Sequence, residues 1–347
     1  MTEPVNPRAR LLAAATILAL LVLATTATFA GESATTDQVI NTFEDTFDVH
    51  PGHRASHANT MCVQGDFVGT SAASALSRSR LFGGPPVTVV GRFSVIGGHA
   101  GGSSARELAL EFRLPDGSLQ HMAMLNTPVF VAAQPLTFNE MIKAVKPDPS
   151  TGQPDEGKLR DFLDSHPDAF AHWNFLAATD PTPGYANSAY FSIHTFRFID
   201  ADGRTHFVRW RFVPLDAEKW LAPSRVAWTY GSLTEERLLE QLRRGPVRWD
   251  MIVFVGQPED TTDNSAIAWP ESRRHFKAGT LRITRASPES AADCQKAAFD
   301  PLIVADGIAV ADDPILLFRS PSYARAFVGR LSRALGPAQV SVVDRQN

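Results

Sequence analysis

Three side chains near the C-terminal end could together hold a metal-bearing cofactor. Arg319, Tyr323 and Arg330 lie in the segment FRSPSYARAFVGR, among mostly apolar neighbours. If this segment is helical, Arg319 lies one turn from Tyr323 on the same face, and its positive charge favours the ionised form of the phenol. An ionised tyrosine is a ligand for ferric haem iron. Arg330, two turns further on, could pair with a haem propionate.

The spacing by itself also has a simpler interpretation. An arginine four residues before a tyrosine occurs by chance on many helices, and both arginines would then belong to a solvated face. Three other tyrosines, Tyr185, Tyr190 and Tyr230, have no arginine four residues before them. Tyr323 is therefore the candidate ligand, and the choice between the two interpretations depends on the rest of the chain.

Three segments earlier in the chain resemble the distal half of the haem site of catalases. They are HRASHANTMCVQGDF (residues 53–67), RFS (92–94) and LNTPVF (125–130). In the catalase family an Arg-x-x-His-Ala run carries the distal histidine, an Arg-Phe-Ser run carries the serine that orients it, and an Asn-Thr-Pro run carries the distal asparagine. The resemblance places Arg54, His57, Ser94 and Asn126 in these positions.

The proximal half follows in the order that the family requires. Arg319, Tyr323 and Arg330 match the Arg-x-x-x-Tyr run and the propionate arginine seven residues beyond the tyrosine. The segments FSIHTFRF, which contains His194, and AIAWPESRRHFKAGTLRI are also similar to catalases. The resemblance extends from about residue 40 to residue 332 and is strongest to the short, single-domain catalase-related peroxidases of exported type.

The resemblance implies a role for each site residue. His57 would act as general base and then as general acid, moving a proton between the two oxygens of hydrogen peroxide. Asn126 would donate a hydrogen bond to the peroxide, and Ser94 would fix the ring of His57. Arg54 and Arg92 would pair with the haem propionates. The haem would be haem b, because the sequence contains no Cys-x-x-Cys-His attachment motif.

Structural alternatives to these roles stay open at the level of the sequence. His57 could be a core histidine, Asn126 before Thr-Pro could be a turn former, and Arg92 could be a surface charge. For His194, core packing and a role beside the haem are equally open. We expect His121 at the surface.

The sequence departs from the catalase pattern near the entrance of the expected pocket. Val131 stands where a second phenylalanine is expected, and AAQ replaces Arg-Asp at residues 132–134. These departures count against efficient dismutation of peroxide. We therefore expect a peroxidase that reduces hydrogen peroxide, and organic hydroperoxides where they fit, with a small organic reductant and with weak catalase activity.

Two other functions fit parts of the sequence. A non-enzymatic haem carrier outside the cytoplasm would keep Arg319 and Tyr323 but would not need His57, Ser94 and Asn126 together. A barrel that binds an apolar ligand without iron would need none of the five. A stoichiometric Soret band of the purified protein would exclude the second function, and peroxide turnover would exclude the first.

The first 30 residues are expected to be a targeting segment. Two arginines precede the apolar run of residues 11–30, which ends in small residues, as in a signal peptide cleaved after Ala30. The alternative is an uncleaved membrane anchor, although the most apolar part, residues 11–24, is shorter than the roughly 20 residues of a membrane span. Residues 31–347 would form one catalase-like domain in the periplasm or at the outer side of the membrane, as a monomer or small homo-oligomer.

Composition and charge agree with a globular chain. Of its 347 residues 44% are hydrophobic and 20% charged, which is enough apolar content for a large core. The net charge of −4 gives no basic surface for nucleic acid. The two cysteines, Cys62 and Cys294, could form a disulfide in an exported protein or remain two buried thiols, and neither has a partner at the spacing of a metal site.

Alternating hydrophobic runs predict mostly antiparallel β structure around the site. The expected strands are residues 87–95, the runs on either side of Asp116-Gly117 and of Asp202-Gly203, and residues 251–256 and 279–284. In the arm after Asp202-Gly203, Arg209 and Arg211 alternate with apolar residues and are expected on a solvated face.

Helices are expected before, within and after these strands. The segments are TTDQVINTFEDTF, SLTEERLLEQLRRG and residues 313–335, the last with a kink or restart at Pro321. We therefore expect an α+β fold, a catalase-like antiparallel β-barrel with flanking helices, in which the haem lies between the barrel and the C-terminal helix.

Overall fold

A computed structural model of the chain describes residues 34–47, 57–96, 105–179, 184–215, 232–288, 294 and 297–335, with the backbone alone for residues 57–59, 232–233 and 333–335. The chain divides into two units, residues 1–33 and residues 34–347. The predicted targeting segment, residues 1–30, lies outside the described residues. The division of the chain at residue 30 therefore stays a prediction.

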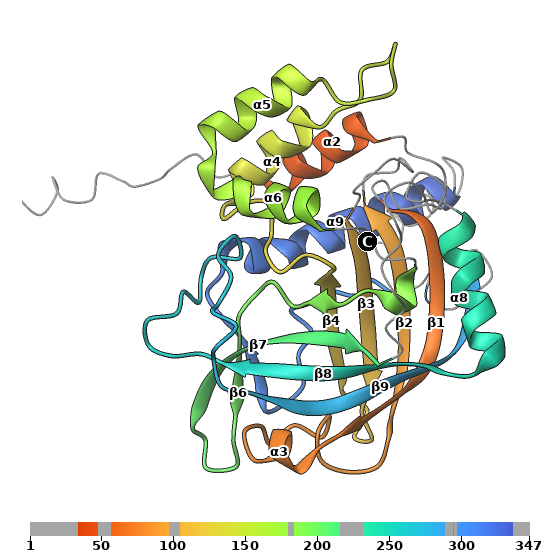
Figure 1. Cartoon of the computed structure of the whole chain (residues 1–347), viewed down its shortest axis with the longest axis vertical. Coiled ribbons are helices and arrows are strands. Elements are labelled where there is room, and N and C mark those ends of the chain that lie inside the picture. Colours follow the sequence, from red (N-terminus) through yellow and green to blue (C-terminus); the bar gives the residue numbers. More distant parts are fainter. Residues whose placement is uncertain are drawn as a thin grey trace, which may run out of the picture. The chain divides into compact units, whose positions relative to one another are not determined.

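A closed barrel of eight antiparallel strands forms the centre of the second unit (Figure 1). The strands are β1 (His57–Gly69), β2 (Val87–Ile96), β3 (Arg106–Arg113), β4 (Leu119–Leu125), β5 (Tyr190–Phe191), β7 (Thr205–Pro214), β8 (Val247–Val255) and β9 (His275–Pro288). Their order is β7-β5-β4-β3-β2-β1-β9-β8, and β8 pairs with β7 to close the ring. Strands β6 (Phe196–Ile199) and β10 (Ile308–Val310) extend the sheet from β7. The predicted antiparallel barrel is confirmed.

Alternation along the strands fills the barrel with aromatic side chains. Phe93 on β2 and Phe112 on β3 are fully buried, and Phe93 packs on Trp249 with ring centroids 5.8 Å apart. A Cβ atom at Gly279 would lie 2.1 Å from the ring of Phe67, so glycine at this position lets the ring fill the interior. The opposite faces of β2 and β3 point out of the barrel, toward the candidate site.

Two surface predictions were wrong, both because a loop covers the outer face of the barrel. Arg209 is buried rather than solvated, and it donates hydrogen bonds to the carbonyl of Ile267 at 2.6 Å and of Asn264 at 3.1 Å. His121 is 3% exposed, beside the ring of Phe299 and 3.2 Å from a carboxylate oxygen of Glu111. A period-two pattern identifies the face that points away from the barrel but does not show what covers that face.

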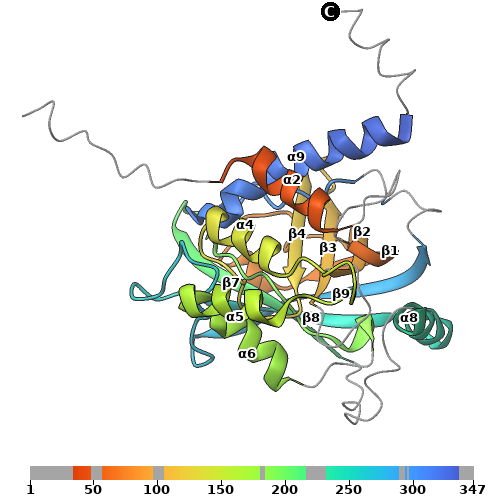
Figure 2. The same cartoon turned by 90° about the horizontal axis from the view of Figure 1, so that it is seen from above.

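Helices gather at one end of the barrel (Figure 1). They are α2 (Thr36–Thr46), α4 (Pro135–Ala144), α5 (Glu156–Ser165), α6 (Phe170–Ala178) and α9 (Pro314–Leu335). The view from above shows α2 beside α9 and α4 (Figure 2), and α2 contacts both. Thr35 and Gln38 form the capping box of α2. Helix α9 continues through Pro321 rather than restarting there.

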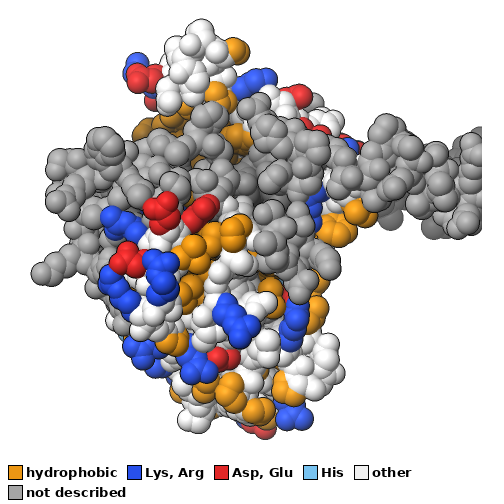
Figure 3. Space-filling view, turned by 90° about the vertical axis from the view of Figure 1, so that its right-hand side faces the viewer, with side chains coloured by type: hydrophobic (Ala, Val, Ile, Leu, Met, Phe, Trp, Pro, Cys, Tyr) orange, Lys and Arg blue, Asp and Glu red, His pale blue; other side chains and the backbone are white. Residues whose placement is uncertain are grey.

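The short turn η1 (Pro167–Ala169) joins α5 to α6 at this end. The elements α3 (Ser71–Ser74), α8 (Ser232–Arg244) and the short turn η2 (Tyr185–Asn187) lie away from it. The face that carries α8 shows basic and acidic side chains side by side (Figure 3). On the surface of the barrel, Arg282 on β9 pairs with Asp66 on β1 at 2.7 Å. Within the described ranges, no helix is both long enough and apolar enough to cross a bilayer.

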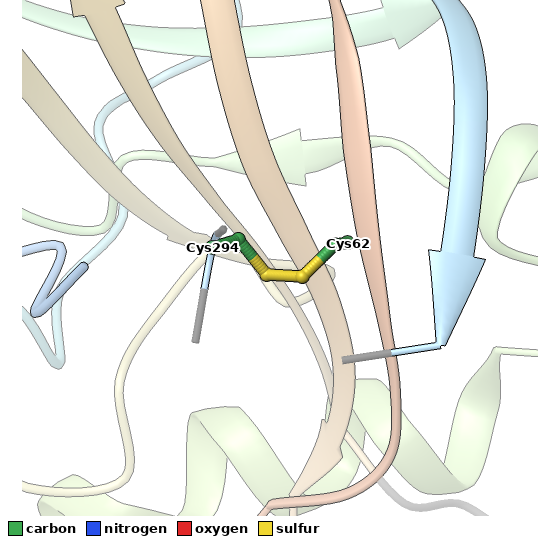
Figure 4. Close-up of a disulfide and its surroundings, with 2 residues drawn as sticks. All are labelled: Cys62 and Cys294. Atoms are coloured by element: carbon green, nitrogen blue, oxygen red, sulfur yellow. A yellow bond between two sulfur atoms is a disulfide. The ribbon is translucent and has the colours of Figure 1, made fainter. Parts of the chain in front are cut away.

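A disulfide joins Cys62 on β1 to Cys294 (Figure 4). Their Cα atoms are 5.8 Å apart, within the range of ordinary disulfides. The pairing that the sequence left open is thus resolved in favour of a bond. The bond ties the segment that carries Phe299 to the outer face of the barrel, where both cysteines, Phe299 and Val90 pack in one hydrophobic cluster.

Candidate functional site

A cavity of about 540 Å³ lies between the barrel wall and helix α9. Residues of β2, β3 and β4 line one side and residues of α9 line the other. Helices α2, α4, α5 and α6 and the segments that connect them complete the lining, together with Ile193 and Ala298. Its walls are mostly apolar, and they include Phe43, Phe130, Phe138, Trp173 and Phe318. Among the described residues the charged or phenolic groups at its surface include Arg92, Glu107, Arg319, Tyr323 and Arg330.

Arg319 and Tyr323 meet on the face of α9 that lines this cavity. The Nη2 atom of Arg319 donates a hydrogen bond to the phenol oxygen of Tyr323 at 2.6 Å, as expected for residues four apart on a helix. Burial lowers the pKa of Arg319, but its electrostatic interactions with Tyr323 and Glu107 and its hydrogen bond to Tyr323 offset this and leave that pKa raised. Arg319 is therefore a permanent cation beside the phenol oxygen.

Asp313 fixes both the start of α9 and a buried histidine. One oxygen of its carboxylate accepts from the backbone N–H of Ile315 at 2.9 Å, which caps the helix. The other oxygen lies 2.8 Å from Nδ1 of His194. Because Asp313 is fully buried, this one side chain couples the register of α9 to the position of His194.

The turn that presents His194 is backbone-constrained. Ile193 has a φ of 48°, a left-handed conformation that a β-branched residue rarely adopts. The hydroxyl of Ser192 donates to the carbonyl of His194 at 3.0 Å and accepts from the backbone N–H of Trp210 at 3.1 Å. These bonds hold the strained turn in place, as is common where a side chain must point in one direction.

His194 connects Asp313 to Arg319. Its Nε2 atom lies 3.3 Å from Nη1 of Arg319, and a guanidinium can only donate. Nε2 must therefore accept, so Nδ1 carries the proton and donates to Asp313. Burial and the charge of Arg319 lower the pKa of His194 against the opposing effect of Asp313, so the imidazole is neutral. The role that the sequence left open for His194 is thus to hold Arg319.

The barrel side of the cavity carries a second group of polar residues. Arg92 is 1% exposed, and its Nη2 atom donates to a carboxylate oxygen of Glu107 at 2.6 Å. Ser94, opposite Glu107 in the strand register, donates to the same oxygen at 3.2 Å. The Nε and Nη1 atoms of Arg92 are buried and have no hydrogen-bond partner among the described residues. The alternative of Arg92 as a surface charge is wrong.

The structure describes only part of the predicted distal group. Asn126 follows β4, and its side-chain oxygen accepts from the backbone N–H of Arg106 at 2.8 Å, which leaves its amide nitrogen as the donor. His57 is the first residue of β1 and pairs with Ile96, two residues from Ser94 along β2. The side chain of His57 lies outside the described residues, as does Arg54. The catalytic roles of His57, Ser94 and Asn126 therefore stay predictions.

The third predicted arginine also lines the cavity. Arg330 is 8% exposed, and its guanidinium lies over the ring of Phe327 with 5.2 Å to the ring centroid. Arg92 and Arg330 thus reach the same cavity from the barrel and from α9.

These residues fit a haem group. The apolar walls suit a porphyrin ring, and the unpartnered donors of Arg92 are the kind of group that a carboxylate satisfies. Tyr323 lines the same cavity, and a phenol oxygen is of the kind that binds ferric haem iron.

Comparison with known proteins agrees with this chemistry. A sequence model of the family named Catalase matches residues 26–341. The chain belongs to the catalase family. It is 42% identical to a catalase-related peroxidase of Synechococcus elongatus over 92% of this chain and 95% of that protein. It is 33% identical to a catalase-related peroxidase of Mycolicibacterium paratuberculosis over 83% of this chain and 92% of that one. As a catalase-family member, the chain is an oxidoreductase that acts on peroxide.

Solved catalases share the fold. A fungal catalase superposes with a TM-score of 0.74 and 21% identity over 81% of this chain and 60% of that one. Catalase A of Saccharomyces cerevisiae gives a TM-score of 0.71 and 22% identity over 82% of this chain and 62% of that one. The chain thus spans about three fifths of the length of these solved catalases.

Sequence reasoning missed two residues of this catalase-family site. Glu107 could have been noticed as an acid in the apolar run ELALEF, where it falls two residues before Ala109 on the outer face. Asp313 before Pro314 carries the pattern of a helix N-cap. That pattern predicts the start of α9 but gives no sign of the contact with His194.

Proposed function

We propose that the chain is a haem b-dependent peroxidase that reduces hydrogen peroxide with a small organic electron donor. The observation that carries this proposal is the hydrogen bond of 2.6 Å from Arg319 to Tyr323, at the wall of an apolar cavity. Membership of the catalase family and the names of two relatives support peroxide as the oxidising substrate. The name peroxidase, shared by both relatives, favours an organic donor over dismutation.

Bound haem would supply the iron that exchanges electrons with peroxide and donor. Tyr323 would hold this iron from the side of α9, with Arg319 keeping the phenol oxygen charged. Arg92, Arg330 and Arg54 would hold the propionates through charge-assisted hydrogen bonds.

The distal residues would move the proton. His57 would take it from one peroxide oxygen and deliver it to the other, so that water leaves. Asn126 would hold the peroxide with its amide nitrogen. The hydroxyl of Ser94 donates to Glu107 and can still accept from the imidazole of His57, which would fix the tautomer of the ring.

We further propose that the protein works outside the cytoplasm. The apolar segment of residues 11–24 after two arginines supports export. The disulfide between Cys62 and Cys294 supports an oxidising compartment. Detection of the mature chain in the periplasmic or membrane fraction after cell fractionation tests this proposal, and recovery in the cytoplasm with reduced cysteines would contradict it.

The proposed activity is tested by purification, haemin titration and turnover. We expect a Soret band in stoichiometric amount and peroxide-dependent oxidation of a dye that exceeds oxygen release. His57→Ala should lower dye oxidation by about 10²–10⁴-fold, the usual contribution of a general acid–base, while the Soret band persists. A colourless protein that takes up no haemin would refute the haem proposal. Oxygen release far above dye oxidation would show that a second peroxide, rather than an organic molecule, is the preferred electron donor.

A further inference from the structure

Glu107 is a buried acid at the centre of the candidate site. It lies on β3, is 3% exposed and lines the cavity. Its neighbour across the strands is Ser94, so both side chains leave the barrel on the same side. A buried carboxylate without cationic partners is costly, and two arginines are among the described partners of Glu107.

The carboxylate lies between two guanidinium groups that come from different parts of the chain. One oxygen accepts from Nη2 of Arg92 at 2.6 Å and from the hydroxyl of Ser94 at 3.2 Å. The other oxygen lies 3.8 Å from Nη2 of Arg319. Arg92 belongs to the barrel and Arg319 to α9. The carboxylate of Glu107 therefore attracts one cation from each of the two walls of the cavity.

The same atom of Arg319 faces both Glu107 and Tyr323. Nη2 donates to the phenol oxygen at 2.6 Å and lies 3.8 Å from Glu107. The negative charge of Glu107 therefore offsets part of the positive charge that Tyr323 experiences. It also offsets the repulsion between two largely buried cations, Arg92 and Arg319, whose side chains are 2% and 17% exposed.

We propose that Glu107 is a positioning residue, the shared counter-charge of Arg92 and Arg319, and that it sets how strongly Tyr323 donates to the haem iron. The effect on donation by Tyr323 rests on the proposed function. The role of Glu107 as a shared counter-charge concerns the chain alone and holds with or without haem. Without Glu107, the full charge of Arg319 would act on the phenol oxygen and weaken it as a donor.

Glu111 provides a matched control for Glu107. It lies four residues along the same strand, is also buried, and pairs with His121 at 3.2 Å and Arg113 at 2.8 Å. It does not line the cavity. Replacing either glutamate by glutamine removes one buried negative charge, but only Glu107→Gln removes it beside Arg319.

The loaded protein tests the effect on the iron. We expect Glu107→Gln to move the ferric/ferrous midpoint potential to a more positive value and to change the tyrosinate-to-iron charge-transfer absorption, while Glu111→Gln leaves both unmoved. Equal shifts in the two variants, or no shift with haem bound, overturn the proposal. If Glu107→Gln does not fold or does not bind haem, Glu107→Asp is the second variant, because it keeps the negative charge. We expect Glu107→Asp to fold and to bind haem, and its failure in either respect overturns the proposal.

The full chain without added haemin tests the counter-charge separately. Thermal melting of Arg92→Met, Glu107→Gln and the double variant forms a double-mutant cycle. We expect each single variant to melt earlier than the wild type, and the double variant to lose less than the sum. Additive losses overturn the counter-charge. A wild type that takes up no haemin refutes the proposed function but leaves this cycle to decide the role of Glu107.

Discussion

At the scale of single residues, the surroundings of the phenol oxygen distinguish Tyr323 from two other tyrosines. Tyr185 and Tyr190 pack against Phe93 inside the barrel, and burial raises the pKa of both phenols above the ordinary value. They are neutral and do not line the cavity. Tyr323 lines the cavity and has the guanidinium of Arg319 at 2.6 Å. Its environment, rather than its residue type, makes it the candidate ligand.

Tyr323→Phe removes one oxygen atom and keeps the ring. We expect haem affinity to fall by more than about tenfold, because loss of a mere supporting partner of a metal ligand already costs about 10–100-fold. Haemin titration followed at the Soret band measures this. Tyr190→Phe is the control, since it loses a buried hydrogen bond of 3.0 Å to the carbonyl of Tyr185 and should affect stability only. Equal haem affinity in both variants would refute Tyr323 as the ligand.

At the scale of elements, helix α9 needs a fixed start to present Arg319 and Tyr323 to the cavity. Pro314 occupies the first turn, where a missing N–H costs nothing, and Asp313 caps the helix. The second oxygen of Asp313 binds His194, whose strained turn begins at Ile193. The helix and the turn between β5 and β6 thus fix each other through one carboxylate.

Replacing Asp313 should separate capping from the contact with His194. Asp313→Ala loses both, and we expect the free energy of unfolding to fall by at least about 1–2 kcal/mol, the usual cost of an N-cap. Asp313→Asn keeps a capping oxygen and should lose less. Urea unfolding of both variants measures the difference. If both variants lose the same amount, the cap at Asp313 contributes nothing measurable to α9.

At the scale of the whole molecule, the disulfide joins two cysteines that are separated by almost the entire sequence of the barrel. Cys62 and Cys294 are 232 residues apart, so the bond restricts the unfolded chain strongly. It also holds the segment of Phe299, whose ring lies under the guanidinium of Arg92 at 5.6 Å. The disulfide therefore also helps to hold the segment that packs against Arg92, a residue of the cavity wall.

Removing the disulfide should destabilise the whole fold. For the double variant Cys62→Ser and Cys294→Ser we expect a loss of about 2–5 kcal/mol in the free energy of unfolding. Denaturant unfolding with and without reductant measures it. The reductant should destabilise the wild type and leave the variant unchanged. A wild type that is insensitive to reductant in the unfolded state, where the bond is accessible, would show that the bond does not form.

Acid should destabilise the fold through its buried histidines. Burial is the main cause that lowers the pKa of His121, His172 and His194, so they fold neutral but take up protons when unfolded. Their contribution to stability is complete above the ordinary histidine pKa of about 6.5 and is lost as the pH falls below it toward the folded pKa values.

Thermal unfolding between pH 8 and pH 5 checks this direction. The midpoint should fall as the pH decreases, and His121→Gln, whose amide can still donate to Glu111, should show a shallower fall. A midpoint that rises on acidification in this range, with the wild type and the variant parallel, would contradict the assignment of these histidines as neutral in the folded state.

Much of the fold could be predicted from the sequence because it depends on local patterns. The hairpin turns at Asp116-Gly117 and Asp202-Gly203 are where the sequence predicts them, with φ values of 84° and 83° at the two glycines. The last helix was predicted from Asp313-Pro314 to about residue 335 and forms there. The burial of Arg209 and His121 could not be predicted in this way, because the loops that cover them come from distant parts of the sequence.

The sequence alone determined the alternation of the strands, the turns between them and the four-residue spacing of Arg319 and Tyr323, because each depends on neighbours a few residues apart. Only the tertiary structure decided that Glu107 lies between Arg92 and Arg319, that Asp313 reaches His194 and that Cys62 bonds Cys294. These contacts join residues more than ten positions apart in the sequence. Closure of the barrel and the docking of α9 bring them together, and no local pattern carries that information.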